Sequence, residues 1–348
     1  SNIGMGCFKS KLNENADSFK SSQNSQNSQN SQNSQKEFRF VDGRRFHNVK
    51  DSVYFLPNDD EESDRLHLQH FMIRYIFQSN FSAPIDHILS EPEVKILDVG
   101  CGAASWSFDI ATTYPWAEIV GLDMSQHQPT QIKPKNFTFV KANVLEGIPF
   151  DNNTFDFVFQ RYLVSAYPSE KWPYVINELV RVLKPGGYLE LCEFSYLFDA
   201  GPADQRLWFT SARICEERGV DWNTYEKLEE YAHKQGQLEN IEKDIKPCYH
   251  GIKSNDIKLS KVAINHMTYL YESLKPIVLK RLQISEDEYD ELVKQSKEEE
   301  FEYDMYYYIV RVYAKKINNN NGDDNINDNI NDNINDNIND NINDNMND

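Results

Sequence analysis

The chain has 348 residues, of which 55 are Asp or Glu and 36 are Lys or Arg, and its formal net charge is −19. This excess of acid argues against nucleic acid as a partner, because nucleic-acid affinity depends mainly on Lys and Arg that neutralise phosphates. The five Cys have neither metal-site nor disulfide-scaffold spacing, and no apolar run reaches the ~18 residues of a membrane span. An intracellular protein without a metal, in the cytoplasm or the nucleus, is therefore predicted.

Low-complexity repeats occupy both ends of the chain. Ser-Gln-Asn repeats over residues 22–33, and Asn-Ile-Asn-Asp repeats, with one Met for Ile, over residues 325–348. Neither repeat has enough mixed apolar volume to offset the entropy of ordering. The tails 1–36 and 317–348 are therefore predicted to be disordered.

A short motif near the start, Met5-Gly6-Cys7, is typical of lipid-modified proteins. If Met5 is the true start, Gly6 would carry a myristoyl group and Cys7 a palmitoyl group, which would hold the protein at a membrane surface. If Met5 is internal, Gly6 never becomes a free amine and the motif has no such role. The sequence leaves both alternatives open.

The first foldable segment is residues 37–91, which we expect to form a helical lid over a site. Its clearest element is an amphipathic helix over 65–77, preceded by a turn-rich loop over 54–60. The face of this helix that should be buried carries Leu66, His70, Ile73 and Phe77.

The segment 92–193 alternates between short β-rich runs and helical stretches, and is predicted to be the core. This alternation predicts a doubly wound parallel sheet of the α/β class, with right-handed crossovers. The predicted strands are 94–99, 119–123, 137–142, 155–159 and 188–193, with helices over 103–114 and 172–183.

The segment 194–300 is predicted to be a mostly helical insertion on the substrate side, and the segment 301–316 a closing strand. Residues 303–314 are rich in aromatic and β-branched side chains, which favours a buried strand over a stacking platform. The helices expected in the insertion are 202–218, 224–235, 259–282 and 285–297.

The strongest chemical signal is the run Asp98-Val99-Gly100-Cys101-Gly102 at the end of the first predicted strand. Glycines at a strand-to-helix turn let the backbone approach a ligand at the carboxyl edge of the sheet. A dinucleotide would favour a third glycine where Ser105 stands, and it would not need Asp98. A carboxylate suits the cationic S-adenosylmethionine better, whereas glycines that serve packing alone remain the structural alternative.

Two later strand ends carry further polar groups. Asp123 ends the second strand, where a carboxylate can accept from both ribose hydroxyls of either NAD or S-adenosylmethionine. After the third strand, the Asn143 side-chain oxygen and the Val144 backbone N–H could meet an adenine edge.

Four motifs in this order resemble the class I S-adenosylmethionine-dependent methyltransferases, over about residues 92–193. They are 96–102, 121–123, 148–150 followed by Phe155-Asp156, and 183–189. The resemblance implies a Rossmann-like, seven-stranded sheet in the order 3-2-1-4-5-7-6, with the last strand antiparallel. The runs 43–48, 54–61 and 64–70 are similar to the fungal LaeA-like branch, which extends the resemblance to about residues 40–316.

The resemblance also assigns roles around S-adenosylmethionine. Asp98, Gly100 and Gly102 would line its methionine end, with Cys101 as a small filler between the glycines. Two departures from the family are Ala104 in place of a glycine and Asn143 in place of an adenine-binding Asp. The remaining assignments are Asp123 with Met124 at the ribose, Asn143 with Val144 at the adenine, and Gln160 near the methyl group.

The expected activity is methyl transfer by in-line displacement to an unidentified small molecule or protein. Candidates for a catalytic base are Tyr54, His67 and His70, and Arg161 is expected at the entrance of the pocket. Each of these residues could instead have a structural role. Residues 159–162 read Phe-Gln-Arg-Tyr, unlike the motif of enzymes that methylate the amino groups of bases.

Two functions of other classes stay open at the level of sequence. The first is a regulatory module that binds S-adenosylmethionine and acts through protein contacts with little catalysis. The second is an NAD oxidoreductase, because Asp123 would serve either adenosine ligand.

Overall fold

The computed structural model describes residues 38–41, 43–48, 54–251 and 254–318. The Gly6/Cys7 lipid motif and nearly all of both predicted tails lie outside the described residues. Contacts divide the chain into one compact unit that ends at Lys316 and a second that begins at Ile317. The elements below all belong to the first unit.

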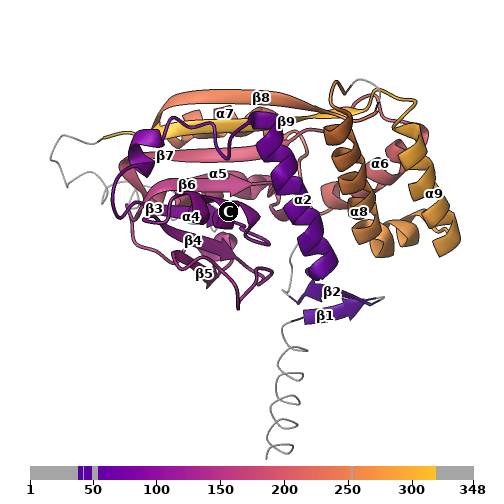
Figure 1. Cartoon of the computed structure of the whole chain (residues 1–348), viewed down its shortest axis with the longest axis horizontal. Helices are drawn as coiled ribbons and strands as arrows, with labels where there is room; N and C mark the ends of the chain where they lie inside the picture. Colours follow the sequence, from indigo (N-terminus) through magenta and orange to yellow (C-terminus); the bar gives the residue numbers. More distant parts are fainter. Residues whose placement is uncertain (1–37, 42, 49–53, 252–253, 319–348) are drawn as a thin grey trace, which may run out of the picture. The chain divides into compact units, whose positions relative to one another are not determined.

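A seven-stranded sheet forms the centre of this unit, in the order β5-β4-β3-β6-β7-β9-β8 (Figure 1). Strands β3 to β7 pair in parallel, and β9 lies antiparallel between β7 and β8. Numbered from β3, this is the order 3-2-1-4-5-7-6 that the family resemblance implied, so the predicted fold is confirmed. The strands are β3 (Lys95–Val99), β4 (Glu118–Asp123), β5 (Phe137–Lys141), β6 (Phe155–Arg161), β7 (Leu183–Phe194), β8 (Leu238–Tyr249) and β9 (Tyr306–Lys316).

Helices flank the sheet, and a helical group packs beside it, where α2 contacts α8, and α6 contacts both α8 and α9 (Figure 1). None of the helices among the described residues has the length and apolar character needed to cross a bilayer. The helices are α2 (Asp60–Phe77), α3 (Asp86–Leu89), α4 (Ser105–Thr113), α5 (Trp172–Val182), α6 (Pro202–Glu216), α7 (Thr224–Gln235), α8 (Ile257–Leu282) and α9 (Glu286–Glu299).

The core lies between the sheet and the helices that cover it. Central strands are apolar on both faces, as burial by helices on each side requires. In β6, Phe157 and Phe159 are fully buried, and the Trp106 ring of α4 stacks on Phe159 with centroids 4.0 Å apart. This packing fixes the start of α4, and with it the turn that precedes the helix, against the sheet.

The sequence missed two strand-containing features. One is the hairpin of β1 (Phe38–Val41) and β2 (Arg44–His47) in the predicted lid. The other is β8, whose apolar residues 238, 241, 245 and 248 have the 3–4 spacing of a helix. Backbone pairing with β9 nevertheless makes this segment a strand. Because β8 has a neighbour on one side only, it is an edge strand of the sheet.

The helix of the lid begins five residues earlier than predicted, at Asp60. The side chain of Asp59 caps it by accepting a hydrogen bond from the Glu62 backbone N–H at 3.1 Å. Three acids in the first turn then lie at the positive end of the helix dipole, which favours this earlier start.

Candidate functional site

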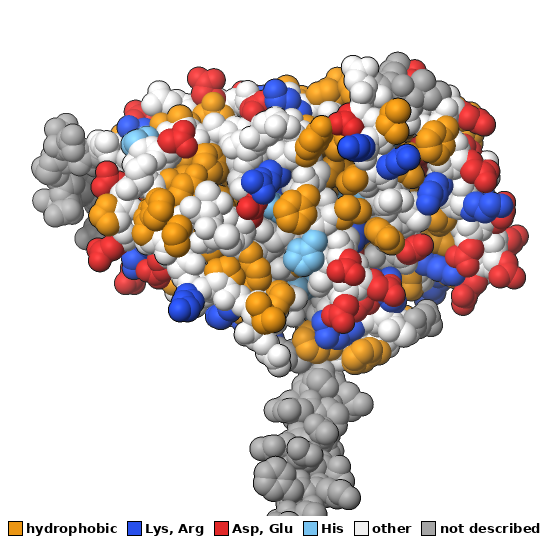
Figure 2. Space-filling view, viewed as in Figure 1, with side chains coloured by type: hydrophobic (Ala, Val, Ile, Leu, Met, Phe, Trp, Pro, Cys, Tyr) orange, Lys and Arg blue, Asp and Glu red, His pale blue; other side chains and the backbone are white. Residues whose placement is uncertain are grey.

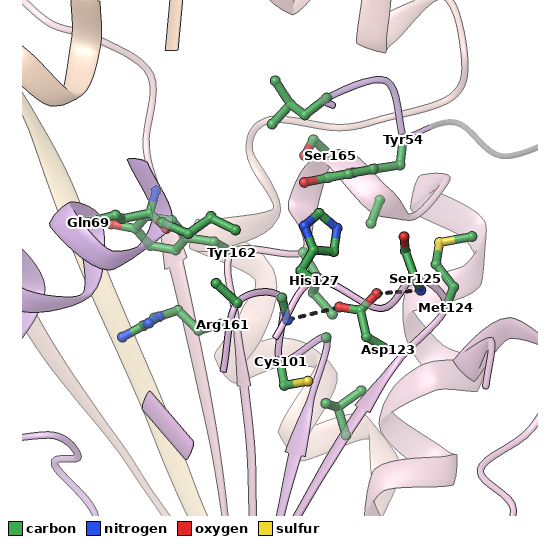
Figure 3. A pocket seen from close by; sticks show the side chains of 18 of the residues that line it. Tyr54, Gln69, Cys101, Asp123, Met124, Ser125, His127, Arg161, Tyr162 and Ser165 are labelled. Atoms are coloured by element: carbon green, nitrogen blue, oxygen red, sulfur yellow. Dashed lines mark hydrogen bonds between the residues drawn. The ribbon is translucent and has the colours of Figure 1, made fainter. Parts of the chain in front are cut away.

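A cavity of about 360 Å³ lies at the carboxyl ends of the central strands, within the volume range of small-molecule sites. Its walls come from the loops after β3, β4, β5 and β6, and from helices α2, α6 and α8. Figure 3 shows part of this lining, with Asp123 and Met124 on one side and Gln69 and Tyr162 on the other. We call these two sides the β4 half and the α2 half of the cavity.

The glycine turn after β3 forms one wall. Gly100 has a φ of +70° and Gly102 a φ of +52°, a conformation that favours glycine. A Cβ on Gly100 would come within 2.6 Å of Leu163 Cδ1, so the turn packs directly on the loop after β6. Ala104, where the family has glycine, also has a positive φ of 60°, so its Cβ is tolerated at some cost in strain.

Asp98 lies at the base of this turn and is only 4% exposed. Its Oδ2 accepts a hydrogen bond from Ser107 Oγ at 2.6 Å. Burial raises the pKa of Asp98 to about 6, against the opposing effects of the Ser107 hydroxyl and the Arg161 charge. A cation placed against this carboxylate would favour its ionised form.

Asp123 ends β4, and backbone groups fix both of its oxygens (Figure 3). Gly102 N–H donates to Oδ2 at 3.0 Å and Ser125 N–H donates to Oδ1 at 2.9 Å. Burial raises the pKa of this carboxyl group despite these hydrogen bonds. The carboxylate is thereby held in one orientation at the cavity wall, with lone pairs left to accept from hydroxyl groups of a ligand.

His127 also lines this half, and sequence analysis did not select it. In Figure 3 its ring is drawn between Asp123 and Tyr54. Its Nδ1 is buried and has no hydrogen-bond partner among the described residues, and burial lowers its pKa. Its position four residues after Asp123 is the one signal that could have suggested it.

Asn143 lines the cavity at the start of the short 3-10 helix Val144–Glu146. Its Oδ1 accepts from Leu145 N–H at 3.1 Å and its Nδ2 donates to Glu146 Oε1 at 3.2 Å. The side chain is therefore committed to capping the helix, although a carbonyl oxygen can accept a second hydrogen bond.

Ten of the thirteen predicted site residues line the cavity, and three do not. Gln160 is fully buried within β6, which runs to Arg161 and so extends past the predicted end, and it accepts from Tyr167 OH at 3.2 Å. His67 contacts Ser105 Oγ through its Nδ1 at 2.6 Å. The residues that do line the cavity are Tyr54, Asp98, Gly100, Cys101, Gly102, Asp123, Met124, Asn143, Val144 and Arg161.

His70 is the third predicted site residue that does not line the cavity, and it hydrogen-bonds to Arg161, which does. Arg161 Nη1 donates to His70 Nδ1 at 3.3 Å, and the opposite ring nitrogen contacts Asp109 Oδ2 at 3.1 Å. Burial lowers the pKa of His70 to about 4, so the ring is neutral near pH 7. Both of its nitrogens are engaged, which leaves none for a base.

A buried polar network supports the α2 half. Arg65 donates to Glu62 through Nε at 2.9 Å and Nη2 at 2.6 Å, and Ser273 Oγ donates to Glu62 Oε2 at 3.0 Å. Arg65 Nη1 lies 2.9 Å from His266 Nε2, which Gln69 Nε2 also approaches at 3.2 Å. Sequence analysis missed these residues, because Arg65 and His266 are 201 positions apart and form no motif.

No cluster of three or more His, Cys, Asp or Glu that could hold a metal ion exists among the described residues. The site combines the buried Asp98, the backbone-held Asp123, an open glycine turn and an opposite wall in which aromatic side chains alternate with Arg65, Gln69 and His266.

Residues 96–187 match a family described as "Methyltransferase domain". Among curated proteins, the chain is 35% identical over 161 residues to "Methyltransferase pytC" of Aspergillus terreus, covering 45% of this chain and 47% of that protein. It is 32% identical over 157 residues to "Secondary metabolism regulator laeA" of Coprinopsis cinerea, covering 44% and 39%. The matches thus span about half the length of these relatives or less.

Among solved structures, the chain is similar to a Haemonchus contortus phosphoethanolamine N-methyltransferase 2 bound to phosphomonomethylethanolamine and S-adenosylhomocysteine. The TM-score is 0.43 at 18% identity, and the match covers 74% of this chain and 60% of that one.

Proposed function

We propose that this chain, which carries a class I methyltransferase domain and resembles the LaeA-like proteins, transfers a methyl group from S-adenosylmethionine to an acceptor. The observation that carries the proposal is the buried Asp98 at the base of the glycine turn, together with Asp123, which is partly exposed and accepts from the Gly102 N–H of the same turn. Asp123 suits the ribose of NAD and of S-adenosylmethionine alike, so the discrimination falls to Asp98, which would repel a diphosphate on the glycine turn and attract a cationic adenosyl ligand. The same point disfavours the NAD alternative.

We assign the cofactor to the β4 half. Asp98 would accept from the ammonium group, and Asp123 would accept from the ribose hydroxyls with its orientation already set by Gly102 and Ser125. Asn143 and Val144 would meet the adenine edge, with Met124 beside the ribose.

When bound, S-adenosylmethionine supplies a methyl group on a positively charged sulfur that an acceptor lone pair can displace. The chain's own contribution is to hold the acceptor in line and to exclude water. Burial raises the pKa of Tyr54, so we propose this residue as a neutral hydroxyl that closes the site, not as a base. Gln160 would act through Tyr167, whose hydroxyl it holds at the cavity wall.

Arg161 and His67 take indirect roles in this proposal. Arg161, fixed by His70, would contribute positive charge near Asp98 at the mouth of the cavity. His67 would position Ser105, which lines the cavity at the first turn of α4.

Calorimetric titration with S-adenosylmethionine, S-adenosylhomocysteine and NADH tests the cofactor. We expect the two adenosyl sulfur compounds to bind and NADH not to bind; binding of NADH alone would reject the proposal. A screen of metabolite and protein extracts with a labelled methyl donor then tests turnover. Tight cofactor binding without transfer to any extract would favour a regulatory module.

The finer assignments of partner and location also remain proposals. We propose a small-molecule or protein acceptor and an intracellular site of action in the cytoplasm or nucleus. Figure 2 shows acidic and basic side chains interspersed on the visible face, with no broad basic patch that would suit nucleic acid. The lipid anchor at Gly6 and Cys7 is testable by mass spectrometry of the protein purified from its own cells.

A further inference from the structure

Asn58 is a buried residue that joins the β1–β2 hairpin to the loop after β4, and its exposed fraction is 0%. On the hairpin side, its backbone N–H donates to the Arg45 carbonyl oxygen at 2.7 Å, and Arg45 Nε donates to its Oδ1 at 3.0 Å. On the other side, its Nδ2 donates to Ser125 Oγ at 2.8 Å. Asn58 and Ser125 are 67 positions apart, so this link between two segments exists only in the folded chain.

The orientation of the Asn58 amide follows from the chemistry of its neighbours. A guanidinium group can only donate, so the amide oxygen faces Arg45 and the amide nitrogen faces Ser125. Ser125 Oγ is therefore the acceptor in its contact with Asn58. Loss of the Asn58 side chain would break the link to Ser125, whereas the backbone carbonyl of residue 58 would still accept from Arg45 Nε at 3.1 Å.

Ser125 connects this link to the carboxylate that we assign to the ribose. Its hydroxyl group accepts from Asn58, and its backbone N–H donates to Asp123 Oδ1 at 2.9 Å (Figure 3). Ser125 itself lines the cavity and is only 4% exposed. The same residue thus contacts the hairpin segment through its side chain and orients Asp123 through its backbone. A displacement of Asn58 is therefore transmitted to the wall of the β4 half.

The hairpin and the loop after it also supply part of the cavity wall. His47, the last residue of β2, lines the cavity, as do Tyr54 and Leu56. The hairpin forms a two-stranded sheet of its own, separate from the seven-stranded sheet. Because an isolated two-stranded hairpin is marginally stable at best, its position on the molecule depends on contacts such as those of Asn58.

We infer that Asn58 is a positioning residue for the cofactor, because its contact with Ser125 makes the position of the hairpin and the orientation of Asp123 depend on each other. Cofactor binding in the β4 half and the docked hairpin then stabilise each other by the same factor. The inference rests on the proposed function, since it takes S-adenosylmethionine as the ligand of this half. It adds a place where binding can be regulated: a partner that draws the hairpin away from Ser125 weakens cofactor binding.

Hydrogen exchange of the hairpin tests the inference without any substitution. The peptide of residues 38–48 is followed by mass spectrometry, with and without saturating S-adenosylhomocysteine. We expect the bound ligand to slow exchange in this peptide at least about fivefold, the lower end of the range for coupled sites. A contact with a purely structural role would protect the hairpin equally in the free and the bound protein.

Two variants assign this coupling to the link itself. Asn58→Leu removes the side-chain hydrogen bonds at similar volume, while Arg44, which donates to both Asp59 oxygens, still holds the hairpin on α2. Ser125→Ala removes the acceptor but keeps the backbone N–H that donates to Asp123. We expect each variant to weaken S-adenosylhomocysteine binding about tenfold and to lose the ligand-dependent slowing of exchange. The double variant should bind no more weakly than the single variants.

Asn152→Leu is the matched control, because the exposed Asn152 also accepts from an arginine, Arg181, at 3.1 Å, and it should change neither measurement. Hairpin exchange that does not respond to the ligand in wild-type protein would overturn the inference. So would unchanged affinity in Asn58→Leu, or losses that add in the double variant. If wild-type protein does not bind S-adenosylhomocysteine, the proposed function fails and the inference with it; if it binds without a response in the hairpin, only the inference fails.

Discussion

The two halves of the cavity were built in different ways. The β4 half takes its residues from strand ends and the loops that follow them, so that Asp98, Gly102 and Asp123 lie where a motif in the sequence placed them. The α2 half combines residues of α2, α6, α8 and β9 with Tyr162, which follows β6, and its contact between Arg65 and His266 joins positions 201 apart. The comparison teaches that local spacing is enough to bring the two acids and the glycine turn together, whereas the opposite wall depends on the long-range packing of helices.

The largest effect should come from breaking the support of the α2 half. Glu62→Ala leaves Arg65 buried without its carboxylate, and we expect the free energy of unfolding to fall by about 3–5 kcal/mol. Urea denaturation measures this. Glu230→Ala, which breaks the exposed Glu230–Lys234 pair, should leave the midpoint unchanged. Should affinity for S-adenosylhomocysteine drop in the folded Glu62 variant, the halves would not be independent.

The next effect concerns the glycine turn of the β4 half. Gly100→Ala would drive a Cβ into Leu163 at a backbone φ of +70°, and we expect a loss of about 3 kcal/mol in cofactor binding, roughly a hundredfold. Calorimetry with S-adenosylhomocysteine measures it. Gly236→Ala is the control, because its φ is +85° with no atom within 4 Å. It should cost stability alone, and normal binding by Gly100→Ala would refute the role of the turn.

A smaller effect is expected when the charge of Asp123 is removed without changing its shape. Asp123→Asn should weaken S-adenosylhomocysteine binding by about 2 kcal/mol, roughly thirtyfold, because one oxygen becomes an amide donor facing a backbone N–H. The exposed Asp151→Asn serves as the control in the same titration. An unchanged dissociation constant in the Asp123 variant would mean that Asp123 does not bind the ribose of the cofactor.

The smallest effect is a dependence of cofactor affinity on pH, which we expect from the ionisation of Asp98. Asp98 has a raised pKa of about 6, so it is ionised above that pH and neutral below it. Affinity for S-adenosylmethionine should therefore be full at pH 7 and fall as the pH drops through 6, by about tenfold at pH 5. Asp98→Asn should bind weakly with a flat profile over this range. If the affinity of the wild-type protein does not decline as the pH falls, Asp98 does not accept from the ammonium group of the cofactor.

Much of the β4 half and of the sheet could be predicted from the sequence. The five core strands follow from short β-rich runs, the first of which stops at Gly100, and the seven-strand order follows from the family resemblance. The match of residues 96–187 to a methyltransferase family confirms the predicted type of domain. The particular roles of Asp98 and Asp123 at a cofactor remain predictions.

The rest of the site could not be predicted, for identifiable reasons. His70 has the helical spacing of a buried position, yet nothing in that spacing indicates that Asp109 and Arg161 occupy both of its nitrogens. Strand β8 has helix-like apolar spacing and becomes a strand because β9 bonds to it. Burial of His266 and Trp208 depends on how α6 and α8 pack on the unit.

The sequence alone determined a nucleotide-type sheet, a glycine turn flanked by two acids, and low-complexity ends. These features are local, because backbone conformation and strand ends depend on residues a few positions apart. Tertiary structure decided the edge strand β8, the contact of Arg65 with His266 and the partners of the His70 ring. Whether a buried donor finds an acceptor depends on distant segments that meet only in the folded chain.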